Sequence, residues 1–234
     1  MLLARYGRPV LGLERKSSVT DPVSDADRAA EDTIRELLAT ERPDDGLLAE
    51  EGSRAEAASG RRWVVDPLDG TVNYLYGFPA WCVSVALQDD QGSAVGVVHD
   101  PLRDETFRGS RGGGCSLNGS PVRVRERAEL SRALVATGFG YDRERRATQA
   151  EVVRRVLPRV RDIRRAGAAA LDLSWLAAGR LDGYWERGLS AWDWAAGRLL
   201  VEEAGGAVAE LAGDPRGLVA ASPGLLPALA ELVT

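Results

Sequence analysis

The stretch Trp63-Val64-Val65-Asp66-Pro67-Leu68-Asp69-Gly70-Thr71-Val72-Asn73-Tyr74 decides how the rest of the chain is interpreted. It begins with an apolar run typical of a strand and continues into an acidic turn. Pro67 favours an extended conformation at Asp66, and Gly70 lets a ligand approach the backbone closely. Asp66 and Asp69 can converge on one point, and hard divalent cations prefer such oxygen ligands. The same residues also suit an ordinary solvated turn after a strand, so this stretch alone leaves both interpretations open.

The composition is that of a soluble globular protein. The chain has 234 residues, 44% hydrophobic and 28% charged, enough for a substantial core in one large domain or two packed halves. The net charge of −5 argues against a nucleic-acid partner and gives no reason to expect attraction to a membrane. No apolar run approaches the roughly 20 residues of a membrane span. Cys82 and Cys115 form no disulfide framework, so we expect reduced thiols and a cytoplasmic protein.

The hydrophobic pattern of the first half predicts a helix followed by a largely antiparallel sheet. The helix has an N-cap at Ser24, a capping-box acid at Asp27 and an end before Pro43. Asn118-Gly119 predicts a hairpin, and His99 is expected in a surface turn. Expected strands cover residues 47–49, 63–65, 81–87, 94–98 and 122–124.

In the second half, expected strands alternate with helices, which is typical of an α/β arrangement. The strands cover residues 133–137, the vicinity of 163, 184–186 and 219–221, and the helices cover residues 149–157, 168–178, 193–201 and 225–232. The pattern changes near residues 126–130. We therefore expect halves of residues 1–126 and 127–234 that share one interface.

Several acidic residues stand at the edges of apolar elements rather than in solvated charge runs: Asp27, Glu50-Glu51, Asp66 with Asp69, and Asp193. Asp193 lies between Trp192 and Trp194, an unusual setting for a solvating charge. Asp193 and Asp27 also have a structural explanation, because an acid at a helix start interacts favourably with the helix dipole or caps the helix.

The sequence argues against catalysis by a protein nucleophile. His99 is the only histidine and has no Ser or Cys motif nearby, and the only lysine, Lys16, follows no Walker-type glycine run. Arg111 to Gly114 could form an anion nest, although a flexible hairpin connection is the favoured interpretation. Carboxylate-rich metal chemistry without histidine ligands remains, which favours Mg²⁺ over zinc or iron.

The chain resembles the inositol monophosphatase family. The matches occur in family order over almost the whole chain: Pro22 to Asp27, Ala49 to Gly52, Asp66 to Tyr74, and Trp192-Asp193-Trp194-Ala195-Ala196-Gly197 running on to Glu203 to Gly206. Residues 138–141 and 164–180 are most similar to actinobacterial inositol-1-monophosphatases. The resemblance implies an α+β fold, a layered α-β-α-β-α sandwich of the inositol monophosphatase and fructose-1,6-bisphosphatase type. The first half would supply the antiparallel sheet and most metal ligands, and the second half Asp193 and the substrate wall.

The resemblance also implies a site with two to three Mg²⁺ ions. Glu50, Asp66 and the Leu68 carbonyl would hold one ion. Asp66, Asp69 and Asp193 would hold a second, with Asp66 bridging, and a third, weaker ion would lie near Glu50. Such a pair of metals activates water and stabilises a leaving oxygen.

Further roles follow from the same resemblance. Asp27 and Thr71 would orient and activate the attacking water. The amides of Gly70 and Thr71 would bind phosphate, to which Asp69 and Asp193 would also lie close. The alcohol would contact Gly167, Ala168, Ala169 and Glu186.

The chain departs from the family at a few positions. Ala49 stands where Gly is usual and Tyr74 where Phe is common, and neither change removes an expected ligand. The family also has a longer first helix than Met1 to Tyr6 can supply.

The leading hypothesis is a lithium-sensitive, Mg²⁺-dependent phosphatase that converts inositol monophosphate to inositol and phosphate and forms a homodimer. Histidinol phosphate, fructose 1,6-bisphosphate and 3′-phosphoadenosine 5′-phosphate are alternative substrates for the same chemistry. A non-catalytic regulatory protein on the same scaffold is the alternative of another class. Loss of a ligand acid would favour it, and all the expected acids are present.

Overall fold

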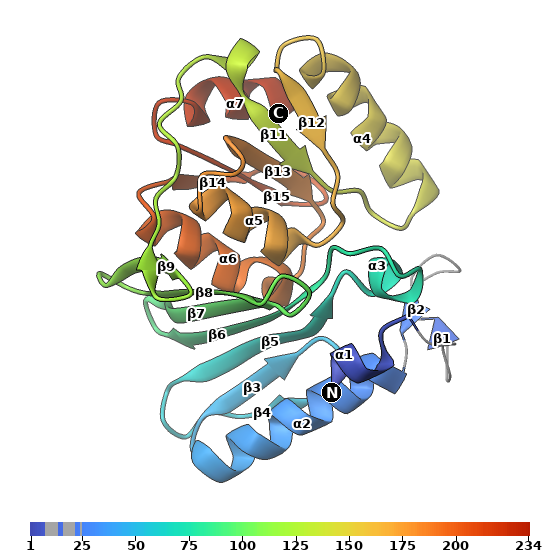
Figure 1. Cartoon of the computed structure of the whole chain (residues 1–234), viewed down its shortest axis with the longest axis vertical. Coiled ribbons are helices and arrows are strands. Elements are labelled where there is room, and N and C mark those ends of the chain that lie inside the picture. Colours follow the sequence, from blue (N-terminus) through green and yellow to red (C-terminus); the bar gives the residue numbers. More distant parts are fainter. Residues whose placement is uncertain (8–13, 16–21, 24) are drawn as a thin grey trace.

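Two β-sheets separated by a pair of helices make up most of the molecule (Figure 1). The computed structural model describes residues 1–7, 14–15, 22–23 and 25–234. The helix cap expected at Ser24 and the segment around Lys16 lie outside these residues. Near the amino terminus, β1 (Glu14–Arg15) pairs with β2 (Pro22–Val23) as a small antiparallel ribbon.

The larger sheet has eight strands in the order β10-β9-β8-β7-β6-β5-β3-β4. Its pairs are antiparallel except for β3 with β5, as the sequence led us to expect. The strands are β3 (Gly46–Ala49), β4 (Arg54–Ala55), β5 (Arg62–Asp69), β6 (Cys82–Asp89), β7 (Gly92–Asp100), β8 (Glu105–Ser110), β9 (Gly114–Leu117) and β10 (Ser120–Pro121).

The smaller sheet has five strands in the order β12-β11-β13-β15-β14. Strand β11 is parallel to both neighbours, and the remaining pairs are antiparallel. The strands are β11 (Leu134–Thr137), β12 (Asp162–Arg164), β13 (Gly183–Arg187), β14 (Ala207–Leu211) and β15 (Gly217–Ala221).

The helices form three layers around the sheets. They are α1 (Leu2–Arg5), α2 (Asp25–Glu41), α3 (Thr71–Leu75), α4 (Arg143–Val156), α5 (Ala169–Ala177), α6 (Ala191–Glu203) and α7 (Leu226–Val233), with a 3-10 turn at Leu130–Arg132. Helix α2 covers the outer face of the larger sheet, α5 and α6 lie between the sheets, and α4 and α7 cover the far face of the smaller sheet (Figure 1). The expected α-β-α-β-α sandwich is therefore confirmed.

Helices α5 and α6 form the central layer, and α5 is the more apolar of the two. Every residue of α5 except Trp175 is buried, and α6 packs against strands of both sheets. The backbones approach closely where α6 crosses β7, since a Cβ atom at Gly96 would lie 3.0 Å from the Ala196 carbonyl oxygen. A helix that is apolar around its circumference belongs in such a central layer.

The structure corrects several details of the sequence interpretation. His99 lies inside β7 opposite Thr106, whose Oγ1 is 3.0 Å from His99 Nδ1, and not in a surface turn. Residues 122–124 form no strand, although the Val124 amide donates to the Ala204 carbonyl. The acidic turn is largely strand, because β5 continues to Asp69. Strands β4 and β14 were not expected, because β4 is short and the sequence of β14 alternates only weakly between polar and apolar residues.

The glycine-rich turn before β9 is also more ordered than a flexible connection. The Glu203 carboxylate of α6 accepts hydrogen bonds from the Gly112 and Gly114 amides, both at 2.8 Å. The turn therefore binds an anion, and the anion is a side chain of the same molecule.

Candidate active site

The end of β5 brings the two central aspartates to the edge of the larger sheet. The register between β5 and β6 shifts between Asp66 and Asp69, and Pro67 at this irregularity needs no ladder donor. Asp66 Oδ1 accepts the Leu68 amide at 2.9 Å. Gly70 follows with φ of 94° as the N-cap of α3, and a Cβ atom there would lie 2.9 Å from the Ala80 carbonyl oxygen. Only glycine fits this turn without strain.

Asp69 is held in place by contacts with helix α5 and strand β6. Its Oδ2 accepts the Ala170 amide of α5 at 2.7 Å and lies 3.6 Å from the Cys82 thiol of β6. The carboxylate is buried, so these contacts restrict its orientation. The larger sheet and the central helix layer thus fix Asp69 jointly.

Thr71 and Asp27 form a buried pair between α3 and α2. Thr71 Oγ1 donates to Asp27 Oδ1 at 2.9 Å and lies 3.2 Å from the Leu68 carbonyl oxygen. Asp27 is fully buried. The two residues expected to orient the attacking water are therefore hydrogen-bonded to each other, and their role toward water stays a prediction.

Asp193 and Glu50 come from opposite halves of the chain. Asp193 is in the first turn of α6 and forms a capping box with Ser190, whose amide donates to Asp193 Oδ2 at 2.6 Å. Glu50 directly follows β3. The turn after it is fixed by buried Glu31, whose carboxylate accepts the amides of Glu51 at 2.6 Å and Ser53 at 2.8 Å.

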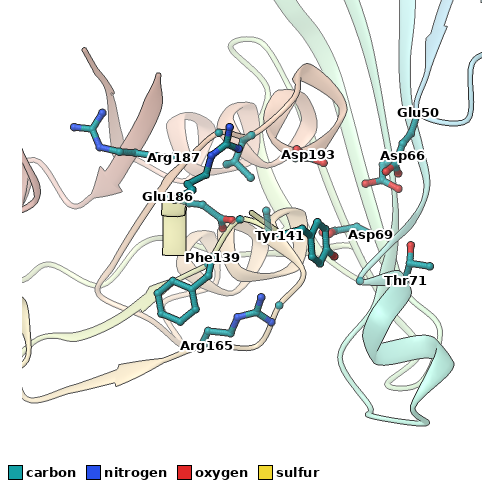
Figure 2. A pocket seen from close by; sticks show the side chains of 18 of the residues that line it. Glu50, Asp66, Asp69, Thr71, Phe139, Tyr141, Arg165, Glu186, Arg187 and Asp193 are labelled. Atoms are coloured by element: carbon teal, nitrogen blue, oxygen red, sulfur yellow. The ribbon is translucent and has the colours of Figure 1, made fainter. Parts of the chain in front are cut away.

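Glu50, Asp66, Asp69 and Asp193 line one pocket of about 160 Å³. Figure 2 shows Glu50 beside Asp66, with Asp69 and Thr71 below them and Asp193 on the other side. Leu68 and Thr71 line the same pocket. Among the described residues, no three His, Cys, Asp or Glu side chains form a closed metal cluster. The acids therefore surround an open pocket, and their all-oxygen donor set fits a hard dication better than zinc.

The acids raise one another's pKa values. Burial, followed by repulsion from Glu50, Asp69 and Asp193, raises the pKa of Asp66 well above its ordinary value. Burial raises the pKa of Asp69 to about 6, although the Ala170 amide opposes the shift. Burial and the charges of Asp69 and Glu50 also raise the pKa of Asp193. Grouping like charges in a pocket is unfavourable without a cation, and a dication would reverse the effect.

Only some of the residues expected to contact the alcohol line the pocket. Gly167, with φ of 91°, and Ala169 line it, whereas buried Ala168 does not and instead packs near Gly70. Glu186 lines the pocket and accepts the Tyr184 hydroxyl at 2.5 Å. Burial raises the pKa of Glu186 to about 7, and the Tyr184 bond opposes this shift.

Sequence reasoning missed several residues around the pocket. Phe139, Tyr141, Arg145 and Arg165 line it from the loop before α4, from α4 itself and from the loop before α5. The resemblance of residues 138–141 and 164–180 to actinobacterial relatives was the one sequence signal for this region, and it assigned no role to these side chains. No periodic pattern in these loops distinguishes them. Asn73 does lie inside the quoted signature. Its Nδ2 donates to the Ala80 carbonyl at 2.6 Å and the Ala166 carbonyl at 2.8 Å, which ties α3 to the substrate wall.

The comparisons agree with this geometry. A profile described as the inositol monophosphatase family matches residues 1–233. An inositol-1-monophosphatase of Rhizobium meliloti is 48% identical over 205 residues, 86% of this chain and 77% of that protein. One of Mycobacterium bovis is 42% identical over 238 residues, 95% and 81% of the two chains. A Xylella fastidiosa protein named Nus factor SuhB is 46% identical over 199 residues, 85% and 72% of the two chains.

The solved structures give the same result. The extragenic suppressor protein suhB of Bartonella henselae superposes with a TM-score of 0.94 at 38% identity, covering 100% of this chain and 92% of that one. The family is generally metal-dependent, as the acid-lined pocket leads one to expect. In the described part of the chain, no helix has the length and apolar character needed to cross a bilayer. The chain belongs to the inositol monophosphatase family and is a phosphoric monoester hydrolase.

Proposed function

We propose that this chain hydrolyses inositol monophosphate to inositol and phosphate in a Mg²⁺-dependent reaction. The observation that carries the proposal is the pocket itself. Four carboxylates from both halves of the chain line it, and the Thr71 side chain, paired with buried Asp27, stands beside them.

The metal roles follow the donor set. Glu50, Asp66 and the Leu68 carbonyl would hold one Mg²⁺, and Asp66, Asp69 and Asp193 a second, with a third ion near Glu50. When bound, such ions supply an activated water and stabilise the charge on the leaving oxygen. Asp66 would be the carboxylate shared by both ions, which would make it the least replaceable ligand.

The protein's own groups would position the reactants. Thr71 Oγ1 donates its proton to Asp27, so its lone pairs are free to accept a hydrogen bond from the attacking water. The amides of Gly70 and Thr71 would donate to phosphate oxygens. As the water oxygen bonds to phosphorus, the water gives up one proton to solvent and the ester P–O bond breaks. The leaving alcohol oxygen takes a proton from solvent, so the products are inositol and phosphate.

The alcohol side favours a polyol. Glu186 reaches the pocket with one oxygen bonded to Tyr184, so its second oxygen can accept a hydroxyl of inositol. Gly167 and Ala169 leave room beside it. Histidinol phosphate, fructose 1,6-bisphosphate and 3′-phosphoadenosine 5′-phosphate are the competing substrates for this chemistry.

Phosphate release tests the proposal. The purified chain is assayed on inositol-1-phosphate with Mg²⁺, with Mg²⁺ plus Li⁺, and with a chelator. We expect release with Mg²⁺ that Li⁺ and the chelator suppress. Absence of release from inositol-1-phosphate and from the three competing substrates would reject the phosphatase proposal and support a non-catalytic role.

We also propose a cytoplasmic homodimer. Both cysteines are free and buried, which suits a reducing compartment. The proposal of a dimer rests on the family resemblance. Light scattering of the purified protein tests it: a mass of two chains would support the dimer, and a mass of one chain would contradict it. The division of the chain near residue 126 also stays a prediction. Helix α6 of the second half packs against the larger sheet, which belongs to the first half.

A further inference from the structure

Two neighbours of Glu186 define where its carboxylate lies in the pocket. Tyr184 and Glu186 are two residues apart in β13, so their side chains lie on the same face of the smaller sheet. Tyr184 belongs to the core cluster that includes residues of α5 and α6, whereas Trp185 belongs to the cluster that includes residues of α7. The alternation of this strand therefore places a phenol and a carboxylate side by side, facing the central helices.

The Tyr184 hydroxyl has a fixed position. Its side chain is fully buried, and its strand lies between β11 and β15, with Tyr184 opposite Ala136 and Ala220. The hydroxyl donates to Glu186 Oε2 at 2.5 Å and, among the described residues, is the one donor to that carboxylate. The last torsion of a glutamate side chain has a broad distribution. A donor held by the core therefore restricts which carboxylate oxygen faces the pocket.

Gly138 provides the space in which this carboxylate lies. Thr137, the last residue of β11, pairs with Trp185, so Gly138 lies next to Glu186. A Cβ atom at position 138 would overlap the carboxyl carbon and both oxygens of Glu186. The backbone of Gly138 does not have a positive φ. Glycine is therefore needed at this position for space and not for backbone conformation.

Other charges also act on the Glu186 carboxylate. They come from several elements and are Asp69 of β5, Arg145 of α4, Arg165 before α5, Asp172 of α5, Arg187 of β13 and Asp193 of α6. Burial raises the pKa of Glu186, the Tyr184 hydroxyl and Arg165 lower it, and Asp69 adds to the rise. The carboxylate is thus attracted and repelled from several sides, and the bond from the phenol gives it one orientation.

We infer that Tyr184 and Gly138 are positioning residues that make the site selective for a polyol. Tyr184 holds one Glu186 oxygen and Gly138 leaves room for the carboxylate, which is directed into the pocket (Figure 2). The second oxygen then accepts a hydrogen bond from an alcohol that has a hydroxyl at that point, and an alcohol without one gains nothing. This inference rests on the proposed phosphatase activity and deepens it.

The test compares two phosphate esters with the same six-membered ring, inositol-1-phosphate and cyclohexyl phosphate, whose ring has no hydroxyls. Tyr184→Phe keeps the aromatic ring and removes the donor. We expect KM for inositol-1-phosphate to rise about tenfold with kcat within twofold, because the lost interaction contributes equally to substrate and transition-state binding. For cyclohexyl phosphate, kcat/KM should change less than twofold. Gly138→Ala should show the same selective loss, because its Cβ atom displaces the Glu186 carboxylate.

The pH dependence is a second readout. The ratio of kcat/KM for inositol-1-phosphate to kcat/KM for cyclohexyl phosphate cancels the titrations that affect both esters. In wild-type protein this ratio should rise with pH as Glu186 ionises. In Tyr184→Phe the rise should occur at higher pH, because the phenol lowers the pKa of Glu186 and its loss raises that pKa.

Tyr74→Phe is the matched control, because the buried Tyr74 hydroxyl donates to the Leu2 carbonyl at 2.9 Å, away from the pocket lining. It should change kcat/KM for either ester less than twofold. In a Glu186→Ala background, Tyr184→Phe should cause less than a further twofold loss on inositol-1-phosphate, because the phenol acts through Glu186. Equal losses on both esters, no loss, or a loss that persists without Glu186 would show the inference to be wrong while the phosphatase proposal stands. If neither these esters nor the competing substrates are cleaved, the phosphatase proposal itself fails.

Discussion

Asp66 shows how much one residue position can determine. Its Oδ1 accepts the Leu68 amide at the end of β5, and burial, followed by repulsion from three other carboxylates, raises its pKa. No neutral side chain would supply the same negative charge to two cations. The charge of this residue is therefore unfavourable in the metal-free protein, and under the proposed metal roles it would be needed in the metal-bound one.

Asp66→Asn should lower kcat on any accepted phosphate monoester at least about a hundredfold, because the shared ligand charge is lost. The variant should be no less thermally stable than wild type in a chelator, since the substitution removes a repelled buried charge. Steady-state kinetics and thermal unfolding measure both effects. Turnover near the wild-type value would contradict the assignment of Asp66 as the bridging ligand.

At the scale of elements, the position of α6 explains how distant segments meet at one site. Its first turn carries Asp193 into the pocket, and its last turn carries Glu203 to the loop before β9. Gly197 allows close packing, because a Cβ atom there would lie 2.7 Å from Leu173 Cβ of α5. Contacts at both ends therefore hold the helix that presents Asp193.

Glu203→Ala should lower the free energy of unfolding by about 1–2 kcal/mol, because the Gly112 and Gly114 amides lose their acceptor. Glu202→Ala is the matched control on the same helix. Its exposed pair with Arg198 contributes about 0.5 kcal/mol or less. Urea denaturation measures both values, and equal losses in the two variants would refute the proposed anchoring role of Glu203.

For the molecule as a whole, the acidic pocket links stability to pH and to metal. The pKa of Asp69 rises from 3.8 to about 6 on burial. A raised carboxyl pKa means that the folded state binds the proton more tightly than the unfolded state. This group therefore destabilises the metal-free fold as pH rises from about 4 to about 6, and the full penalty remains above that range.

Thermal unfolding in a chelator, from pH 4 to pH 7, should show Asp69→Asn gaining stability relative to wild type as pH rises. The comparison with wild type is needed because carboxyl groups with lowered pKa values make the fold more stable as pH rises. Glu105 is one example, since Arg180 lowers its pKa. Saturating Mg²⁺ should raise the unfolding temperature of wild type at pH 7 and that of the variant much less. A pH-independent difference in the chelator would contradict the assigned cause.

The sequence predicted most of the elements because their hydrophobic periods are clear. The helix before Pro43, the strands around residues 63–65 and 219–221, and the Asn118-Gly119 hairpin all appear near their expected positions. His99 was misplaced because the Asp100-Pro101 turn begins one residue later than its composition indicated. Strand β14 was missed because its pairing partner, β15, supplies a stability that local propensity does not reveal.

The linear sequence by itself determined the family and the inventory of acids, and the single histidine and the glycine turn led to the prediction of oxygen-ligated metal chemistry. Tertiary structure alone decided what surrounds that chemistry. It placed Asp27 against Thr71, bonded Asp69 to α5, covered Ala168 and brought Arg145 and Arg165 to the lining of the pocket. Side-chain type and local spacing are encoded residue by residue, whereas burial and pairing depend on which segments pack together across long sequence separations.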